Sequence, residues 1–444
     1  MVQTRSVAAR GGSQDEAEVL DPSTKFLYSP HTLTVLLAAI VGLIAWARPF
    51  NPPDTPSDPA TAASLDYQHA KNGIWAVVYA FLIISTVQGP DTKMIRPHPA
   101  FWRFVFGLVT CYTLFMVYLL FQSADGARQT LKHLYPELGV ELDERHYGTD
   151  CALYKPGQGI NWEVINDTVF DEFVVAHILG WWGKTLMLRD RTMLWIISIG
   201  FELMEVTFQH WLPNFNECWW DSWILDVAIC NNLGIALGMW SISYFDSKEY
   251  DWRGMSQQPS LLAKARRSLL QFTPKSFSNL KWQAFASPKR CLQCLFPIAV
   301  FLLFEVNHFF LKFVLWVPPS NPLNPIRLFL LLGVGLPGMR ECYEYIEASG
   351  SPQGADMLKL GAFAWLGLAL ALVETLVSIK FGKGCVWRRG GRGSAVRRWM
   401  PGWHAWCGSL CRGCLGRAFT PLHMCPPFHS HDAACSRHPG PRTS

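Results

Sequence analysis

Long apolar segments that alternate with charged loops are the feature that most limits how this chain can fold. A helix that crosses a bilayer needs about 20 apolar residues, so several of the segments are short and their bounds hold to within a few residues. The sequence therefore predicts an all-α fold, a polytopic transmembrane helical bundle with about nine spans. The expected spans are Leu33–Ala47, Gly73–Val87, Phe101–Phe121, Phe173–Leu188, Leu194–Trp211, Trp223–Phe245, Leu292–Trp316, Ile326–Tyr345 and Leu358–Ile379.

The composition agrees with a membrane protein. Of the 444 residues, 50% are hydrophobic and only 16% are charged, and the apolar ones come in blocks. Lys and Arg form no patch interleaved with aromatic residues, so nucleic acid is not an expected partner. The first 25 residues are polar and lack the apolar core of a signal peptide, so the first span is expected to act as its own insertion signal. The chain has 13 cysteines, of which Cys111 and Cys230 are expected to be small buried hydrophobes.

Loop charges predict the orientation of the spans. Basic residues gather after the second span, before the fifth and after the sixth, and these three loops fall on one side, which is therefore expected to be cytosolic. The loop after the third span is rich in acids and falls on the other side, where Asn166 begins the sequon Asn-Asp-Thr. A glycoprotein with a lumenal Asn166 is the resulting expectation. The basic residues are Lys93, Arg96, Arg103, Arg189, Arg191, Lys248, Arg253, Lys264, Arg266, Arg267, Lys275, Lys281, Lys289 and Arg290.

Three regions are expected along the chain. Residues 1–30 form a cytosolic N-terminal segment, residues 31–382 form the transmembrane domain that carries the candidate site, and residues 383–444 form a basic tail rich in Cys, Gly and Trp. The tail lacks an apolar span and is expected to be disordered. By the span count it begins on the lumenal side, where its arginines conflict with the positive-inside trend.

Ionisable residues concentrate in the fourth to sixth spans. Burying one carboxylate at mid-membrane costs about 3 kcal/mol or more, and several like charges repel each other further. A divalent cation would relieve this cost. Calcium takes six to eight oxygens and suits a carboxylate-rich site with an amide such as Asn214, whereas zinc would want more His or Cys. The acidic candidate ligands are Glu202, Glu205, Glu217, Asp221 and Asp226, and His177 precedes them on the fourth span.

A simpler alternative remains for each of these residues. The acids can pair with Lys184, Arg189 or Arg191, or point into water beyond the helix ends. A single histidine such as His177 is more often structural, but beside a cluster of acids it becomes a candidate general base. Trp219 needs only the membrane interface to explain its place.

One stretch resembles an active-site signature and is rejected. Residues Asp125 to Gly148 partly match the DGxxAR…G…D…D signature of CDP-alcohol phosphotransferases. The Ala-Arg pair follows Gly126 directly, the later Gly is displaced, and Tyr147 stands where the last Asp should be. The sequence therefore predicts no active site of that class.

Five motifs, in order along the chain, resemble those of the eukaryotic phosphatidylserine synthases. They are "IRPHPAFWR" from Ile95, "AHILGWWGKTLMLRD" from Ala176, "FELMEVTFQHWLPNFNECWWDSWILDVAICNNLGI" from Phe201, "QFTPKSF" from Gln271 and "LKFVLW" from Leu311. The resemblance runs from about residue 22 to residue 382. The stretch "FQSADGARQTLKHLYPELGVELDERHYG" resembles the type 2 members, which use phosphatidylethanolamine, more than type 1, which use phosphatidylcholine.

The resemblance implies a calcium-dependent base exchange in the endoplasmic reticulum membrane, including its mitochondria-associated part. Free L-serine would replace the ethanolamine of phosphatidylethanolamine, in a site on the lumenal side, without using a nucleotide. His177 would be the catalytic residue, and the five acids would bind calcium. Asn214, Glu217 and Asp221 would also bind substrate, and Arg96 would serve a regulatory role. Whether the chain forms a homo-oligomer stays open.

The resemblance ends after "SIKFG", where the family continues with another apolar span and a charged tail. Here "KGCVWRRGGRGSAVRRWM" follows instead. Two rival functions therefore stay open: a multi-span cation or small-solute transporter, whose acids would line an ion path, and a catalytically inactive form of the synthase with an alternative terminus.

Overall fold

The described part of the fold consists of helices and one small two-stranded sheet. The computed structural model describes residues 32–47, 58–92, 94, 97–142, 151–157, 159–170, 172–209, 211–212, 215, 217–246, 258–271, 280–349 and 359–390. The chain divides into two units, Met1–Val386 and Trp387–Ser444. The helices are α3 (Thr32–Ala47), α4 (Pro59–Gln88), α5 (Pro99–Phe121), α6 (Ala124–Leu131), α7 (Trp162–Val169), α8 (Glu172–Leu188), α9 (Arg191–Phe208), the π-helix η3 (Asp221–Asn231), α10 (Asn232–Asp246), α11 (Leu261–Gln271), α12 (Pro288–Val314), α13 (Leu323–Ser349) and α14 (Ala362–Gly390). Strands β1 (Tyr154–Lys155) and β2 (Gly159–Ile160) pair antiparallel between α6 and α7.

Within the described residues, five helical stretches are long and apolar enough to cross a membrane. They lie in α4, α5, η3 with α10, α12 and α14. The predicted helical membrane protein is thus confirmed, but the count of about nine spans is not. Helices also form where the other spans were expected, but α8 has only 17 residues and α9 only 18. Helix α13 is long, and charged residues such as Arg327, Arg340 and Glu341 interrupt its apolar face.

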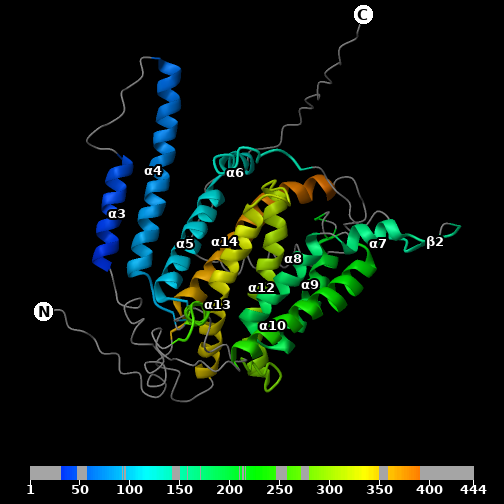
Figure 1. Cartoon of the computed structure of the whole chain (residues 1–444). Helices are drawn as coiled ribbons and strands as arrows, with labels where there is room; N and C mark the ends of the chain where they lie inside the picture. The colour runs from blue at the N-terminus through cyan, green and yellow to red at the C-terminus, as the bar shows by residue number, and fades with distance from the viewer. Residues whose placement is uncertain are drawn as a thin grey trace, which may run out of the picture. The chain divides into compact units, whose positions relative to one another are not determined.

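Helices α5, α8 to α10 and α12 to α14 lie side by side as a bundle, and the C-terminal end of α4 packs against the first half of α5 (Figure 1). The tightest contact joins α8 to α10 through two glycines four residues apart. A Cβ atom on Gly234 would lie 2.6 Å from the Ile178 carbonyl oxygen, and one on Gly238 would lie 2.4 Å from the Thr185 Cβ. Small residues at this spacing let two membrane helices approach closely. The glycine pair therefore fixes the face of α8 that carries His177 against α10.

A largely buried charged network holds the other half of the bundle together. The Arg327 guanidinium on α13 donates to both carboxylate oxygens of Glu374 on α14, at 2.9 and 2.6 Å. Tyr112 on α5 donates to the same carboxylate at 2.7 Å, and the Nδ1 atom of His308 on α12 lies 2.8 Å from the Arg327 Nη1. Because these charges are paired and hydrogen-bonded, the network links four helices without leaving a charge unpaired.

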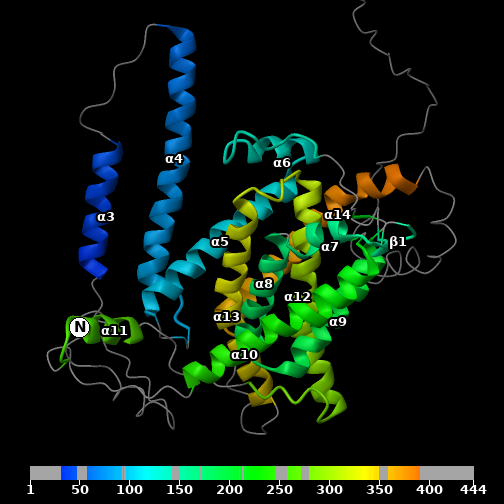
Figure 2. The same cartoon turned by 45° about the vertical axis from the view of Figure 1, so that its right-hand side comes forward.

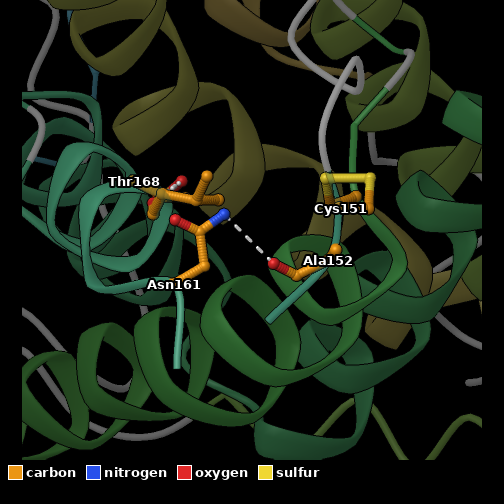
Figure 3. The surroundings of a disulfide bond; sticks show 6 residues. Cys151, Ala152, Asn161 and Thr168 are labelled. Carbon is orange, nitrogen blue, oxygen red and sulfur yellow. Dashed lines mark hydrogen bonds between the residues drawn. A yellow bond between two sulfur atoms is a disulfide. The ribbon is translucent and has the colours of Figure 1, made fainter. Parts of the chain in front are cut away.

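A disulfide that the sequence did not predict joins two loops at one end of the bundle. Cys151, just before β1, is bonded to Cys218, which lies between α9 and η3. Figure 3 shows the nearby hydrogen bond from the Asn161 side-chain amide to the Ala152 carbonyl, 3.2 Å long, which closes the sheet over this connection. The acid-rich loop and the α9–η3 loop therefore share one end, as the loop charges indicated.

The basic loop after α10 returns to the opposite end of the bundle. There the Trp282 indole donates to the carbonyl of Leu188, the last residue of α8, at 2.9 Å, and Arg290 pairs with Glu347 at the end of α13. At the disulfide end, α6 lies across the tips of the helices (Figure 2). Of the two cysteines expected to be buried, Cys230 is buried and Cys111 is half-buried.

Candidate active site

Three consecutive elements, α8, α9 and η3, supply the ionisable residues of the site. Helix α8 carries His177, Trp181 and Lys184 at spacings of four and three, so that they share one face. Glu202 and Glu205 share one face of α9 in the same way. The segment that follows is a π-helix of 11 residues, and π-helical turns within helices are frequent at functional sites.

His177 is held by two polar side chains from η3. Its Nε2 lies 2.6 Å from the Asn231 Oδ1, and its Nδ1 lies 3.7 Å from the Asp226 Oδ1. The Asn231 amide nitrogen donates to the Ser198 hydroxyl on α9 at 2.8 Å. Asn231 is almost fully buried, whereas the His177 side chain keeps 27% of its surface exposed. The imidazole is therefore fixed in orientation yet still open to a ligand.

The hydrogen bonds assign the proton on the neutral imidazole. Because Asn231 donates its amide to Ser198, its oxygen is left to accept, and Nε2 of His177 carries the proton. The Trp181 indole nitrogen, which can only donate, lies 3.2 Å from the same Nε2. A protonated Nε2 cannot accept from it, so we take the shorter Asn231 contact as the hydrogen bond and the Trp181 contact as close packing. Nδ1 then keeps its lone pair and faces Asp226. If His177 takes up a proton on Nδ1, the Asp226 carboxylate would stabilise the imidazolium ion that forms.

The five predicted acids lie close enough to one another to interact electrostatically, and Asp226 lies beside His177, although they do not form a metal cage. Glu205 is repelled by the charges of Glu217, Glu202 and Asp226, and Asp226 by those of Asp221 and Glu202. Burial, and then repulsion from the neighbouring acids, raises the pKa of the Glu217 carboxyl, in the α9–η3 loop, well above its ordinary value. Among the described residues, no three His, Cys, Asp or Glu side chains converge closely enough to hold an ion as they stand.

The donor set nevertheless has the chemistry of a hard cation site. Its side chains offer carboxylate oxygens and an excess of negative charge, which calcium prefers, and few nitrogen or sulfur ligands. Glu202 is buried, with only 2% of its surface exposed, so its ionised form needs a positive partner close by.

Lys184 makes an ion pair that the sequence did not predict. Its ammonium lies 2.8 Å from the carboxylate of Glu305 on α12. Glu305 is not one of the five predicted acids. The ion pair of Lys184 is therefore not the one that the simpler alternative expected. Arg189 donates to the carbonyl of Leu186, at 3.0 Å, in the turn after α8.

Of the other three predicted site residues, the structure describes only Asn166. Asn214 and Arg96 fall outside the described residues. Asn166 is exposed, on helix α7, where the Thr168 hydroxyl of the same sequon donates to the Val164 carbonyl. Sequence reasoning missed Asn231 and Ser198, and a polar amide within an otherwise apolar span was the signal for Asn231.

Comparison with known proteins identifies the family. The phosphatidyl serine synthase family model matches residues 97–382. The chain is 50% identical over 383 residues to CDP-diacylglycerol--serine O-phosphatidyltransferase 2 of Oryza sativa subsp. japonica, which covers 86% of this chain and 87% of the rice protein. It is 45% identical over 375 residues to CDP-diacylglycerol--serine O-phosphatidyltransferase 1 of Arabidopsis thaliana, over 84% of this chain and 86% of that protein.

Relatives in animals extend the comparison. Phosphatidylserine synthase 2 of Homo sapiens is 40% identical over 379 residues, which cover 84% of this chain and 73% of the human protein. The resemblance drawn from the five sequence motifs is confirmed, and it covers all the helices that build the His177 site. The chain belongs to the phosphatidylserine synthase family.

Proposed function

We propose that this chain makes phosphatidylserine by calcium-dependent base exchange, in which L-serine replaces the ethanolamine of phosphatidylethanolamine. The observation that carries the proposal is the fixed orientation of His177 by Asn231, with its free Nδ1 beside Asp226. A base so placed can deprotonate an alcohol, which is the chemistry that an exchange of head groups needs.

The residues of the chain would act as follows. His177 takes the proton of the serine hydroxyl on Nδ1, and Asp226 stabilises the imidazolium that forms. The serine oxygen bonds to phosphorus as the bond from phosphorus to the ethanolamine oxygen breaks. His177 then returns the proton to the departing ethanolamine oxygen, so that charge and atoms balance. Asn231 and Ser198 keep the ring in position throughout.

Calcium would be held by Glu202, Glu205, Glu217, Asp221 and Asp226, with Asn214 as an amide ligand. The chemistry that it supplies when bound is neutralisation of the charge on the lipid phosphate. Glu217 and Asp221 would also orient the substrates from the α9–η3 loop.

A second candidate donor comes from the names of the plant relatives, which specify CDP-diacylglycerol. The partial CDP-alcohol phosphotransferase signature has a structural role instead. Arg128 pairs with Asp125 at 3.0 Å, donates to the Val314 carbonyl at 3.0 Å and stacks 3.5 Å above the Trp316 ring. These contacts connect α6 to the end of α12. Because Arg128 is engaged in them, this stretch does not support binding of a CDP group, and we favour phosphatidylethanolamine as the donor.

The endoplasmic reticulum, including its mitochondria-associated membrane, is the proposed location, with the site on the lumenal side. The Cys151–Cys218 disulfide supports this, because disulfides persist in oxidising compartments and this one joins the loops that carry Asn166 and Glu217. Asn166 would be glycosylated there. Arg96, on the cytosolic side, would contribute to regulation.

The test is the purified full chain in liposomes with labelled L-serine. Phosphatidylethanolamine, phosphatidylcholine or CDP-diacylglycerol is supplied in separate samples, and labelled phosphatidylserine, released ethanolamine and released CMP are measured. We expect labelled lipid and free ethanolamine only with phosphatidylethanolamine and calcium. Serine flux without labelled lipid would identify a transporter, and CMP release would identify the nucleotide-linked donor.

Two further samples separate the remaining alternatives. Release of labelled ethanolamine without serine would indicate a phosphohistidine intermediate rather than direct displacement. A chain in which residues 383–444 are replaced by the family ending tests whether the present chain is a catalytically inactive form. Activity in the replaced chain, with none in the present chain, would show that the tail abolishes catalysis.

A further inference from the structure

The Lys184–Glu305 ion pair is a part of the site to which the exchange chemistry above gives no role. Lys184 lies on α8 and Glu305 on α12, and their side chains keep 14% and 21% of their surface exposed. A lysine and a glutamate within a membrane bundle are costly and usually mark a functional site. Neither side chain is therefore completely buried.

Lys184 of this pair and His177 both contact the indole of Trp181. The Lys184 ammonium lies over the Trp181 ring, 4.0 Å from its centroid, while the indole nitrogen of Trp181 lies 3.2 Å from the His177 Nε2. The Phe201 ring of α9 closes the other side, 6.0 Å from the ammonium. Trp181 thus separates a cation from a base by the width of one side chain.

Lys184 and Glu305 interact electrostatically with several other groups of the site. Lys184 and Glu305 both act on His177 through their electrostatic fields, Lys184 also attracts the Glu202 carboxylate, and Glu305 repels that of Glu205. Among the described residues, Lys184 is thus a cation that acts on both the histidine and a site carboxylate. This arrangement complements a small molecule that carries one negative group, one positive group and one hydroxyl.

We propose that Lys184 and Glu305 form the binding site for the acceptor amino acid, in which Lys184 binds the α-carboxylate of L-serine and Glu305 binds its α-ammonium. The proposal rests on the proposed function, and it names what that function leaves open, the residues that select the acceptor. Free serine is a zwitterion, so its two charged groups can replace the Lys184–Glu305 contact with two ion pairs.

The arrangement also explains how serine would be preferred over the ethanolamine that leaves. Ethanolamine has the ammonium and the hydroxyl but no carboxylate, so it can pair with Glu305 and would leave Lys184 without an anion. A site built to pair a charged group disfavours the analogue that lacks it, because a buried charge is then left unpaired. Lys184 therefore acts as the residue that distinguishes serine from ethanolamine.

The experiment measures two acceptors with one protein. Full-length K184M is reconstituted with phosphatidylethanolamine, and incorporation of labelled L-serine and of labelled ethanolamine is followed as each concentration is varied. We expect the KM for serine to rise about 10- to 100-fold, the loss of one charge-assisted contact, while ethanolamine exchange stays within about threefold of the unmodified chain. K184R should retain most of the serine affinity, and E305Q should weaken both acceptors.

A matched lysine controls for the substitution itself. Lys380 on α14 donates to the Leu120 and Gln122 carbonyls, at 2.7 Å each, and takes no part in the site. K380M should leave the serine KM unchanged. An unchanged serine KM in K184M, or an equal loss for serine and ethanolamine, would overturn the proposal, the second because it indicates a purely structural link between α8 and α12.

The unmodified chain provides a test that does not depend on the folding of a variant. Serinamide keeps the ammonium and the hydroxyl of serine but has no carboxylate charge, and it should be used at least about tenfold less well. Equal use of serine and serinamide would overturn the proposal. If the chain makes lipid only from CDP-diacylglycerol, the base-exchange function fails, yet the serine KM of K184M still tests this site, because serine is the acceptor for either donor.

Discussion

Replacing Asn231 by leucine tests whether the hydrogen bonds around His177 set its reactivity. Leucine branches at Cγ as asparagine does, so the change removes the contact of 2.6 Å to the His177 Nε2 and the one of 2.8 Å to the Ser198 hydroxyl without opening a cavity, although its methyl groups are bulkier than the amide. Asn231 keeps only 1% of its surface exposed, so water cannot replace it. Each buried polar group left without its partner costs about 1–3 kcal/mol.

If this free energy of about 1–3 kcal/mol is lost from the stabilisation of the transition state, kcat falls about 5- to 150-fold, because 1.4 kcal/mol is a factor of ten. The KM for serine should change little, because Asn231 contacts the base and not the proposed amino acid site. N231D keeps an oxygen that can accept from Nε2 and should retain more activity than N231L. The assay is exchange of labelled serine in liposomes, with thermal unfolding measured on the same samples.

A second buried asparagine supplies the matched control. Asn307 on α12 is 2% exposed and donates to the Ala371 carbonyl and the Thr375 hydroxyl, at 3.2 and 3.0 Å. N307L should lower the unfolding temperature as N231L does, with a much smaller loss of kcat. A kcat for N231L within twofold of the unmodified chain, or equal losses in both variants, would refute the role assigned to Asn231.

Four further outcomes are expected. G238A places a Cβ 2.4 Å from the Thr185 Cβ and should destabilise the chain by about 1–3 kcal/mol, seen as a lower unfolding temperature, whereas G73A, with no atom within 4 Å, should not. E374Q leaves the Arg327 charge buried without its partner and should cost about 3–5 kcal/mol in the same measurement, a value that a fully solvated pair would not approach. C151S should lower the unfolding temperature and make it insensitive to reducing agent, and continued sensitivity would argue against the Cys151–Cys218 bond. Removal of calcium with a chelator should abolish exchange and readdition should restore it, and activity that persists in chelator would refute the metal assignment.

The sequence by itself determined the helical membrane class and pointed to the acids and the histidine of the candidate site. Long apolar runs can satisfy their backbone hydrogen bonds in a bilayer only as helices, so the class follows from composition and spacing alone. The acids from Glu202 to Asp226 were visible because carboxylates are rare within such runs. His177 was chosen for the same reason, and the five family motifs agreed with it.

Only the tertiary structure decided which of these side chains meet. The rotation of each helix about its own axis determines its partners, and local periodicity does not specify that rotation. Hence Asn231 rather than another polar residue holds His177, and Lys184 pairs with Glu305, a residue more than 100 positions away in the sequence. The count of about nine spans is not confirmed for a related reason. Helices such as α13 carry charges that lower their apolar character, and neighbouring helices pair these charges, as Glu374 pairs Arg327.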